Sequence, residues 1–224
     1  MSSHCTPGSE SPRRHDLVFV SPTAWRSFLA THSEFADDAL VDGWIKRGWP
    51  LIARCFVGNE RQGVPLGLPL PPSAGKRRIG LLMDPTGIRA VARPPLLSAA
   101  FCVAPVAWIP TLRKLDDVAA RLGVEARVFG SLAWCLLTGL NYLTARSDLD
   151  FILSMPHPRD FAQLMTELGS IASAAPMRLD GEIVRDDGVG VHWRELYSGA
   201  RDVLAKTVGG PTVLNSAEFI GGSI

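Results

Sequence analysis

The amino-terminal part of the chain begins its regular pattern with a short apolar run, Leu17–Val20, which predicts a strand. Ser21 and Pro22 follow directly, and this pair is typical of a helix N-cap and first helical residue. A second helix is expected over residues 34–47, because apolar positions recur there at helical spacing and Gly48 follows as a stop signal. The pattern therefore predicts a strand followed by two helices.

The next stretch favours strands separated by a long irregular segment. Residues 51–57 and 76–83 are predicted strands, and 88–92 is a candidate partner for the second of them. Between the first two, residues 58–75 carry so many Gly and Pro residues that we expect no regular structure there. Loops of that length are usually functional. A proline-marked segment, 94–110, is the expected junction between two subdomains.

From residue 111 onward, helical and strand patterns alternate. The expected elements are helix 111–122, strand 124–129, helix 160–174, strands 178–185 and 190–193, and strand 203–208. Residues 186–188, Asp-Asp-Gly, form a turn signal between the paired strands. The tail after Gly209 is only loosely specified. The fold class expected from this alternation is α/β (α+β), with a tail at 1–14 predicted to be disordered and two further parts at 15–105 and 110–224.

Composition narrows the class of protein only slightly. The 224 residues are 46% hydrophobic, with a formal net charge of +1, as in an ordinary globular protein. A near-neutral balance argues against broad nucleic-acid binding, which needs a basic surface. We therefore expect no nucleic-acid partner.

Cysteine spacing and hydropathy indicate the compartment. The four cysteines show no CxxC spacing, which argues against a zinc site or a disulfide framework. The first 16 residues lack an apolar core segment, and the longest apolar run, 96–109, is too short to span a bilayer. The expectation is a cytoplasmic protein without membrane association.

The densest chemical signal lies between residues 128 and 153. An apolar strand end leads into Gly130 and Ser131, and an apolar run of about two helical turns follows. Free backbone N–H groups at a helix N-terminus favour an anion such as a phosphate. Asp148 and Asp150 then come at a strand start, and alternation would place both carboxylates on one face. Hard oxygen ligands at this spacing suit Mg²⁺, with Mn²⁺ as an alternative.

Each of these features also has an ordinary structural explanation. Asp148 and Asp150 could be solvated acids at a strand edge, and spacing alone leaves both readings open. Gly130 and Ser131 could be a strand-to-helix turn with a serine cap. The phosphate role of the turn depends on the acids lying nearby.

A Gly-Ser turn, a helix and an Asp-x-Asp strand together resemble the nucleotidyltransferase superfamily that includes DNA polymerase β. A narrower resemblance is to the malonate decarboxylase holo-acyl-carrier-protein synthases, also called phosphoribosyl-dephospho-CoA transferases. The residues that carry it are Gly130-Ser131-Leu132-Ala133-Trp134, Leu137-Thr138-Gly139-Leu140, Tyr142-Leu143-Thr144, Ser147-Asp148-Leu149-Asp150, and the upstream runs 63–72 and 75–79. The likeness covers roughly residues 15 to 210.

The resemblance implies a specific reaction and a polymerase-β-like nucleotidyltransferase fold in the carboxy-terminal half, with 110–224 as the catalytic domain. The smaller amino-terminal subdomain, 15–105, would bind a substrate or partner. The donor would be 2′-(5″-triphosphoribosyl)-3′-dephospho-CoA, and the acceptor a serine of the acyl-carrier subunit of malonate decarboxylase. A phosphodiester would form and pyrophosphate would leave, with Mg²⁺ held by Asp148 and Asp150.

The same resemblance implies a third acid on a neighbouring strand. Asp180 is the best-placed match, as a metal ligand that helps to deprotonate the incoming hydroxyl. Glu182 would share its face and is the alternative. The competing interpretation of Asp180 is a turn residue, because Asp-Gly is a turn dipeptide.

Basic residues supply candidate substrate contacts. Lys76 and Arg78 would share one face of a strand and could contact a triphosphate or an acidic carrier protein. Arg146, just before the acids, and Lys206, in a predicted strand, are further candidates. A solvated charged face is the competing interpretation for each.

Other side chains are interpreted as structural. His157 and His192 have no paired ligand at metal spacing, and Trp134 and Trp193 are expected in the core. No Ser-His-Asp arrangement, Walker A motif or GxGxxG is present. Two alternatives remain: a nucleotidyltransferase with another acceptor, such as a small molecule, RNA or protein, and a carrier-protein-binding module without catalysis.

Overall fold

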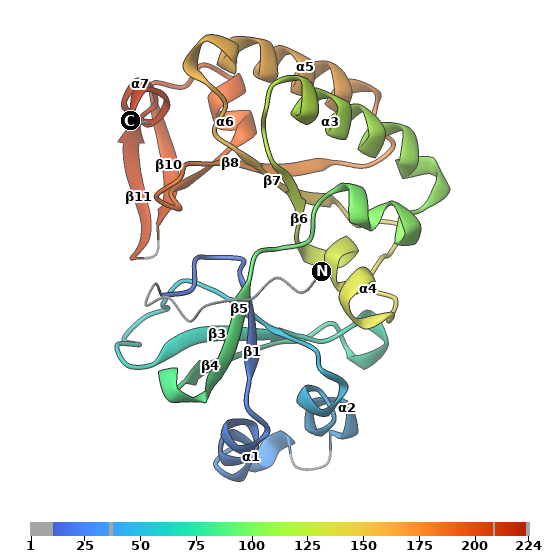
Figure 1. Ribbon diagram of the computed structural model, residues 1–224, viewed down its shortest axis with the longest axis vertical. Helices are drawn as coiled ribbons and strands as arrows, with labels where there is room; N and C mark the ends of the chain where they lie inside the picture. The colour runs from blue at the N-terminus through green and yellow to red at the C-terminus, as the bar shows by residue number, and fades with distance from the viewer. Residues whose placement is uncertain (1–10, 36–37, 208, 223–224) are drawn as a thin grey trace, which may run out of the picture. The chain divides into compact units, whose positions relative to one another are not determined.

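The structure, a computed structural model, describes residues 11–35, 38–207 and 209–222 (Figure 1). The chain forms two compact units, Met1–Arg93 (unit 1) and Pro94–Ile224 (unit 2). Residues 94–105, assigned from sequence to the amino-terminal subdomain, lie in unit 2. Leu97 explains this, because its side chain is buried in the core of unit 2 and its backbone N–H donates to the Ala126 carbonyl, N to O 2.9 Å.

The expected disordered tail, 1–14, lies mostly outside the described residues. Of its last four residues, Arg13 is tied to the fold, since its backbone N–H donates to the Asp16 carboxylate at 2.8 Å. Burial lowers the pKa of the Arg14 guanidinium. This end of the tail is therefore part of unit 1.

Unit 1 is built on a five-stranded antiparallel sheet with the order β4-β3-β2-β1-β5. Its strands are β1 Leu17–Val20, β2 Leu51–Ala53, β3 Val64–Pro69, β4 Arg78–Met83 and β5 Ile88–Ala92. Its helices are α1 Pro22–Ala30 and α2 Ala39–Asp42, with short 3-10 helices η1 Ser33–Phe35, η2 Ile45–Arg47, η3 Pro72–Ala74 and η4 Pro85–Gly87. The predicted start of α1 is confirmed, because the Ser21 side chain accepts the Ala24 N–H and Pro22 is the first helical residue.

The single helix expected over 34–47 is wrong. The described part of this stretch holds three short elements, η1, α2 and η2. Asp38 starts a new helix there, because its carboxylate accepts the backbone N–H groups of Leu40 and Val41 at 3.1 and 3.2 Å. A local cap therefore outweighs the apolar spacing.

The irregular segment expected over 58–75 is also wrong, because β3 lies inside it and pairs with strands on both sides. Leu66 and Leu68 are fully buried at strand spacing, and this burial outweighs the Gly and Pro signals. Pro65 still contributes its carbonyl, which accepts the Arg54 N–H at 3.0 Å.

The pairing proposed for 88–92 is wrong as well. The strand forms, but it pairs with β1 in the register Val18↔Val91 and lies at the opposite edge of the sheet from β4. The backbone link between Ser21 N and Gly87 O, 2.8 Å, fixes the start of β5 beside the end of β1. The pairing partner of β5 is therefore set by a contact between residues distant in sequence, which the local sequence pattern does not encode.

Unit 2 is built on a six-stranded sheet with the order β11-β10-β9-β8-β7-β6. Its strands are β6 Ala126–Val128, β7 Leu149–Ser154, β8 Leu179–Val184, β9 Gly190–His192, β10 Asp202–Thr207 and β11 Gly210–Asn215. Its helices are α3 Ile109–Arg121, α4 Gly130–Thr138, α5 Phe161–Ala174, α6 Trp193–Tyr197 and α7 Ser216–Gly221, with 3-10 helices η5 Ser98–Val103, η6 Val106–Trp108 and η7 Pro158–Asp160. The predicted helix and strand alternation is confirmed, whereas the tail after Gly209 is more regular than expected.

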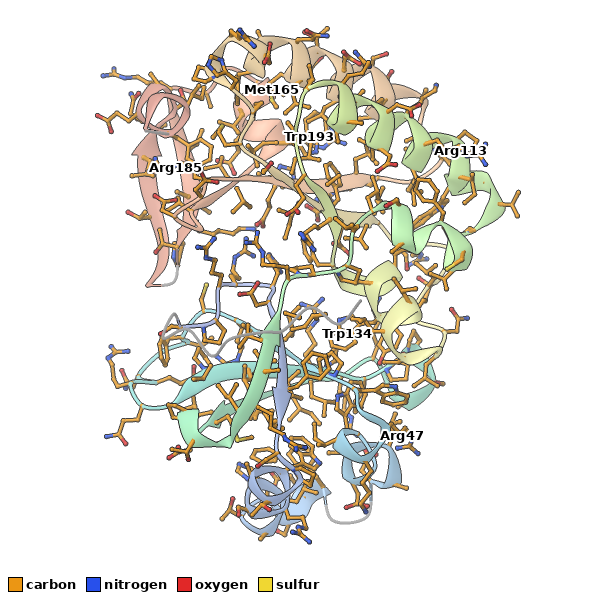
Figure 2. All side chains as sticks on the ribbon, in the orientation of Figure 1. Arg47, Arg113, Trp134, Met165, Arg185 and Trp193 are labelled. Carbon is orange, nitrogen blue, oxygen red and sulfur yellow. The ribbon has the colours of Figure 1, made fainter. Side chains whose placement is uncertain are left out.

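Helices α3, α5 and α6 cover one face of this sheet, as Figure 1 shows. Figure 2 places Met165 and Trp193 in the apolar layer between α5 and the sheet, and both side chains are buried there. The strands contribute Phe151, Leu179 and Ile183 to the same core. Trp193 is thus a core residue, and Trp134, which is 3% exposed, is buried as well, as predicted.

None of the helices in the described ranges is long and apolar enough to span a membrane. The longest of them, α5, has 14 residues and lacks the length for a bilayer crossing.

Candidate active site

Two aspartates meet on neighbouring strands of unit 2. Strands β7 and β8 are parallel, and their register pairs Asp150 directly with Asp180. Every other strand pair in the described part of this sheet is antiparallel. Because parallel strands begin at the same edge of a sheet, both aspartates lie near one edge.

The strand alternation aims both side chains away from the helices. Leu149 and Phe151 are fully buried against the helical layer, so Asp150 between them points to the opposite face. Leu179 and Gly181 flank Asp180 in the same way. The paired aspartates therefore lie side by side on this second face of the sheet.

Gly130 brings the N-terminus of α4 against Asp150. Its backbone is left-handed, with φ +62°, and a Cβ built on it would lie 1.9 Å from Asp150 Oδ2. The Phe129 N–H donates to the Asp150 carbonyl at 3.1 Å, which ties the turn to β7. The predicted proximity of the Gly-Ser turn and the second aspartate is therefore present.

The ordinary interpretation of Ser131 as a helix cap is wrong. Helix α4 begins at Gly130, so Ser131 is the second helical residue, and Phe129 precedes the helix without a capping side chain. Half-buried Ser131 thus lies in the first turn, where backbone N–H groups lack intrahelical acceptors.

Asp148 precedes β7 at the end of a hydrogen-bonded loop. The Thr144 N–H donates to Ser147 Oγ at 2.9 Å, and the Ser147 N–H returns to the Thr144 carbonyl at 3.1 Å. Upstream, burial raises the pKa of the Tyr142 hydroxyl well above its ordinary value. The loop is therefore anchored by Tyr142 and closed by a turn before Asp148.

Sequence reasoning missed Arg178 as a site residue. Its guanidinium lies between two predicted metal ligands, with Nε 4.0 Å from Asp148 Oδ2 and Nη2 3.5 Å from Asp180 Oδ2. The signal was available, because Arg178 stands two residues before Asp180 and strand alternation puts both on one face. At these distances, and with a largely exposed side chain, the contacts are loose.

His192 also lies in the site, although sequence reasoning treated it as structural. Its Nε2 is 2.9 Å from Asp180 Oδ1. Its Nδ1 accepts the Arg194 N–H at 3.1 Å, which caps α6. Sequence spacing gave no sign of this pair, because the two residues are on different strands.

Glu182, the alternative third acid, is engaged elsewhere. Its side chain is 3% exposed and bonds Lys206 Nζ at 2.8 Å. Lys206, a candidate phosphate contact, is half-exposed in β10 and forms an ion pair with this buried carboxylate of β8. Asp180 is the more accessible of the two acids.

The remaining basic candidates are placed as follows. Lys76 does not share a strand face with Arg78 as expected, because Lys76 precedes β4 in a left-handed turn with φ +51°. Both side chains are exposed on unit 1. Arg77 between them forms an ion pair with Asp38 at 2.9 Å. Arg146 is exposed in the loop before Asp148.

The donor set suits a hard divalent cation that also binds phosphate. Within the described ranges, no group of three or more His, Cys, Asp or Glu side chains is already gathered to hold a metal ion. Mg²⁺ does not need such a group, since it usually takes one or two carboxylates plus substrate phosphates. Asp150 and Asp180, paired in register beside an uncapped helix N-terminus, meet this requirement.

Comparison with known proteins gives a consistent result over both units. The family description "Phosphoribosyl-dephospho-CoA transferase MdcG N-terminal domain" matches residues 13–94, and "Phosphoribosyl-dephospho-CoA transferase MdcG C-terminal domain" matches 95–217. A phosphoribosyl-dephospho-CoA transferase from Bradyrhizobium diazoefficiens is 47% identical over 223 residues, which is 100% of this chain and 99% of the relative.

More distant relatives carry the same description. A Xanthomonas campestris protein is 34% identical, over 86% of this chain and 89% of the relative. A Pseudomonas putida protein is 31% identical, over 92% and 94%. No solved structure matches this chain, so the polymerase-β-like fold stays a prediction while the mixed α/β class is confirmed.

Proposed function

Since this chain belongs to the phosphoribosyl-dephospho-CoA transferase MdcG family, we propose that it transfers a phosphoribosyl-dephospho-CoA group to a serine of an acyl-carrier protein. The proposed donor is 2′-(5″-triphosphoribosyl)-3′-dephospho-CoA, and the proposed acceptor is the carrier subunit of malonate decarboxylase. The serine oxygen bonds to the α-phosphorus, the bond from that phosphorus to the bridging oxygen of the β-phosphate breaks, and pyrophosphate leaves.

The chemistry of such a transfer is mainly positioning and charge neutralisation. In this proposal the backbone N–H groups of Gly130 and Ser131, at the N-terminus of α4, bind the donor phosphates. Arg178 and Arg146 supply cationic groups on the same unit. Asp180 is the group that takes up the serine proton or orients the hydroxyl.

A divalent cation completes the proposal. Asp148, Asp150 and Asp180 are the residues that would hold it, and a bound Mg²⁺ or Mn²⁺ would neutralise phosphate charge and favour ionisation of the serine hydroxyl. Arg178 lies at the place between Asp148 and Asp180 where positive charge is needed.

One observation carries this proposal within the structure. Only a residue without a Cβ allows the phosphate-type turn at Gly130 to approach the Asp150 carboxylate so closely. That approach brings the N-terminus of α4 and the Asp150 and Asp180 pair to one place on unit 2. A nucleotidyl-type transfer needs both.

The direct test is intact-mass spectrometry of the purified apo-carrier subunit. Incubation with the donor, Mg²⁺ and this protein should add one phosphoribosyl-dephospho-CoA group to the carrier, and EDTA should stop the addition. Pyrophosphate release with ordinary nucleoside triphosphates and another acceptor would instead support a different nucleotidyltransferase. Carrier binding without any added mass would support a non-catalytic module.

Asp148→Asn and Asp150→Asn should each lower the transfer rate by about 100-fold or more, because each removes a carboxylate that would hold the divalent cation, and that cation would neutralise the phosphate charge. The melting temperature should change little, since both side chains are partly exposed. Rates come from the mass assay and stability from thermal denaturation. Asp202→Asn is the control, because Asp202 is an exposed acid at the start of β10. Normal turnover in either site variant would refute the metal assignment.

A further inference from the structure

The side chain of His192 has both ring nitrogens engaged, and the two contacts differ in kind. Nδ1 is 3.1 Å from the backbone nitrogen of Arg194, which can only donate. Nδ1 is therefore the acceptor and carries no proton. In the neutral ring the proton is then on Nε2, which donates to Asp180 Oδ1 at 2.9 Å.

This bond distinguishes the two oxygens of Asp180. Oδ1 is engaged by the imidazole, whereas Oδ2 is turned toward Arg178, 3.5 Å away. The His192 side chain is only 19% exposed, and its backbone is held in β9, where it pairs with Glu182 of β8. The imidazole, bonded at both nitrogens, is therefore less exposed than the Asp180 side chain, which is 33% exposed.

We infer that His192 is a positioning residue that holds the Asp180 carboxylate with Oδ2 presented to the site, beside Asp150. The inference rests on the proposed function for its kinetic consequence. His192 does not act as the base itself, because the contacts with Arg194 and Asp180 leave no free ring nitrogen. Groups that orient a functional carboxylate or metal ligand typically contribute about 10- to 100-fold to activity or metal affinity.

Two conservative substitutions separate the two contacts. In His192→Gln the amide nitrogen reaches the position of Nε2, so the donor to Asp180 is retained and the cap of α6 is weakened. In His192→Asn the amide oxygen replaces Nδ1, so the cap is retained and the donor to Asp180 is lost. If His192 served only to cap α6, His192→Gln would have the lower kcat of the two variants.

We expect His192→Asn to lower kcat about 10- to 100-fold with little change in the KM of the donor, and His192→Gln to keep most of the wild-type kcat. His157→Asn is the matched control, since exposed His157 caps η7 through Nδ1 to the Arg159 N–H at 3.4 Å. That variant should retain wild-type rates.

A spectroscopic readout tests the arrangement independently of transfer. Nitrogen-15 NMR of the imidazole rings in the full chain should show His192 protonated on Nε2, and Asp180→Asn should shift the Nε2 signal while leaving that of His157 unchanged. A His192 ring protonated on Nδ1, unaltered kcat in His192→Asn, or equal losses in the Asn and Gln variants would overturn the inference. If the wild-type protein adds no group to any carrier, the proposed function fails, and the NMR result still decides whether His192 positions Asp180.

Discussion

At the scale of single residues, Gly130 determines whether the site can form. Its positive φ costs a residue with a side chain about 1–2 kcal/mol, and a methyl group there would overlap the Asp150 carboxylate. The position therefore combines a conformational requirement with a steric one. Gly139, at the other end of α4, has φ +72° but nothing within 4 Å of a built Cβ.

These two glycines offer a matched pair of substitutions. Gly130→Ala should displace Asp150 and lower transfer by about 100-fold or more, because it disturbs the turn proposed to bind phosphate and a carboxylate together. Gly139→Ala should cost only the backbone strain and leave transfer largely intact. Melting temperatures and the mass assay distinguish the outcomes. Equal losses of activity in both variants would show that α4 stability alone, and not the approach to Asp150, explains the effect.

At the scale of elements, the register of β7 and β8 sets the site. Phe151 pairs with Gly181, and a Cβ at that glycine would lie 2.1 Å from the Phe151 ring. The aromatic ring therefore needs a glycine opposite it, which fixes the register between the strands. A shift by one residue would move Asp180 to the helical side of the sheet.

In unit 1, Arg54 and Glu60 hold the chain that follows β2. Strand β2 ends at Ala53, earlier than the predicted strand 51–57. Arg54 donates to both Glu60 carboxylate oxygens at 2.7 Å and to the Leu66 carbonyl at 3.0 Å. The Arg54 side chain and the Val57 N–H lower the pKa of Glu60 from 4.5 to about 2. The chain after β2 is therefore held to β3 by a charge-assisted hydrogen-bond pair.

This pair predicts a specific pH dependence of stability. Because the pKa of Glu60 is lower in the folded protein, its contribution should be complete above pH 4.5 and lost as the pH falls to about 2. Urea midpoints of the full chain, followed by tryptophan fluorescence across that window, should converge for wild type and Glu60→Gln. Glu34→Gln, at an exposed position, is the control and should follow wild type throughout. If the difference in urea midpoint between wild type and Glu60→Gln stayed constant with pH, the lowered pKa of Glu60 would be contradicted.

At the scale of the whole molecule, the two family matches divide the chain where the structure does, with residues 13–94 and 95–217 matching separate domains. The acids, the turn at Gly130 and Ser131, and His192 all belong to unit 2. The exposed cations Lys76 and Arg78 belong to unit 1. Any contribution of Lys76 and Arg78 to binding therefore comes from unit 1, whereas the proposed phosphate contacts and the acids are residues of unit 2.

That division predicts a separation of kinetic effects. Replacing Lys76 and Arg78 together by Gln should raise the KM of the donor about tenfold, as expected for a lost charged hydrogen bond, and leave kcat nearly unchanged. The increase should diminish at high salt, because exposed charges are screened. Arg77→Gln is the control, since Arg77 is engaged with Asp38. A fall in kcat without a change in KM would place these cations in the chemical step instead.

Sequence patterning predicted most elements of unit 2 and fewer of unit 1. Helices α3 and α5 have uninterrupted apolar faces that bury Leu112, Leu115, Leu164 and Leu168, so local periodicity and tertiary packing agree. In unit 1, β3 forms from a proline-rich segment and β5 joins β1, because pairing partners distant in sequence decide both. Elements whose stability is local are predictable, and elements stabilised by remote pairing are not.

The sequence by itself determined the alternation of helices and strands in unit 2, the turn at Gly130 and the carboxylates at Asp148 and Asp150, because these depend on neighbouring residues. Tertiary structure alone decided which groups meet: Asp180 beside Asp150, Arg178 between two acids, His192 against Asp180, and Glu182 taken by Lys206. The physical reason is strand register, which brings side chains together across hydrogen-bonded neighbours whatever their separation along the chain.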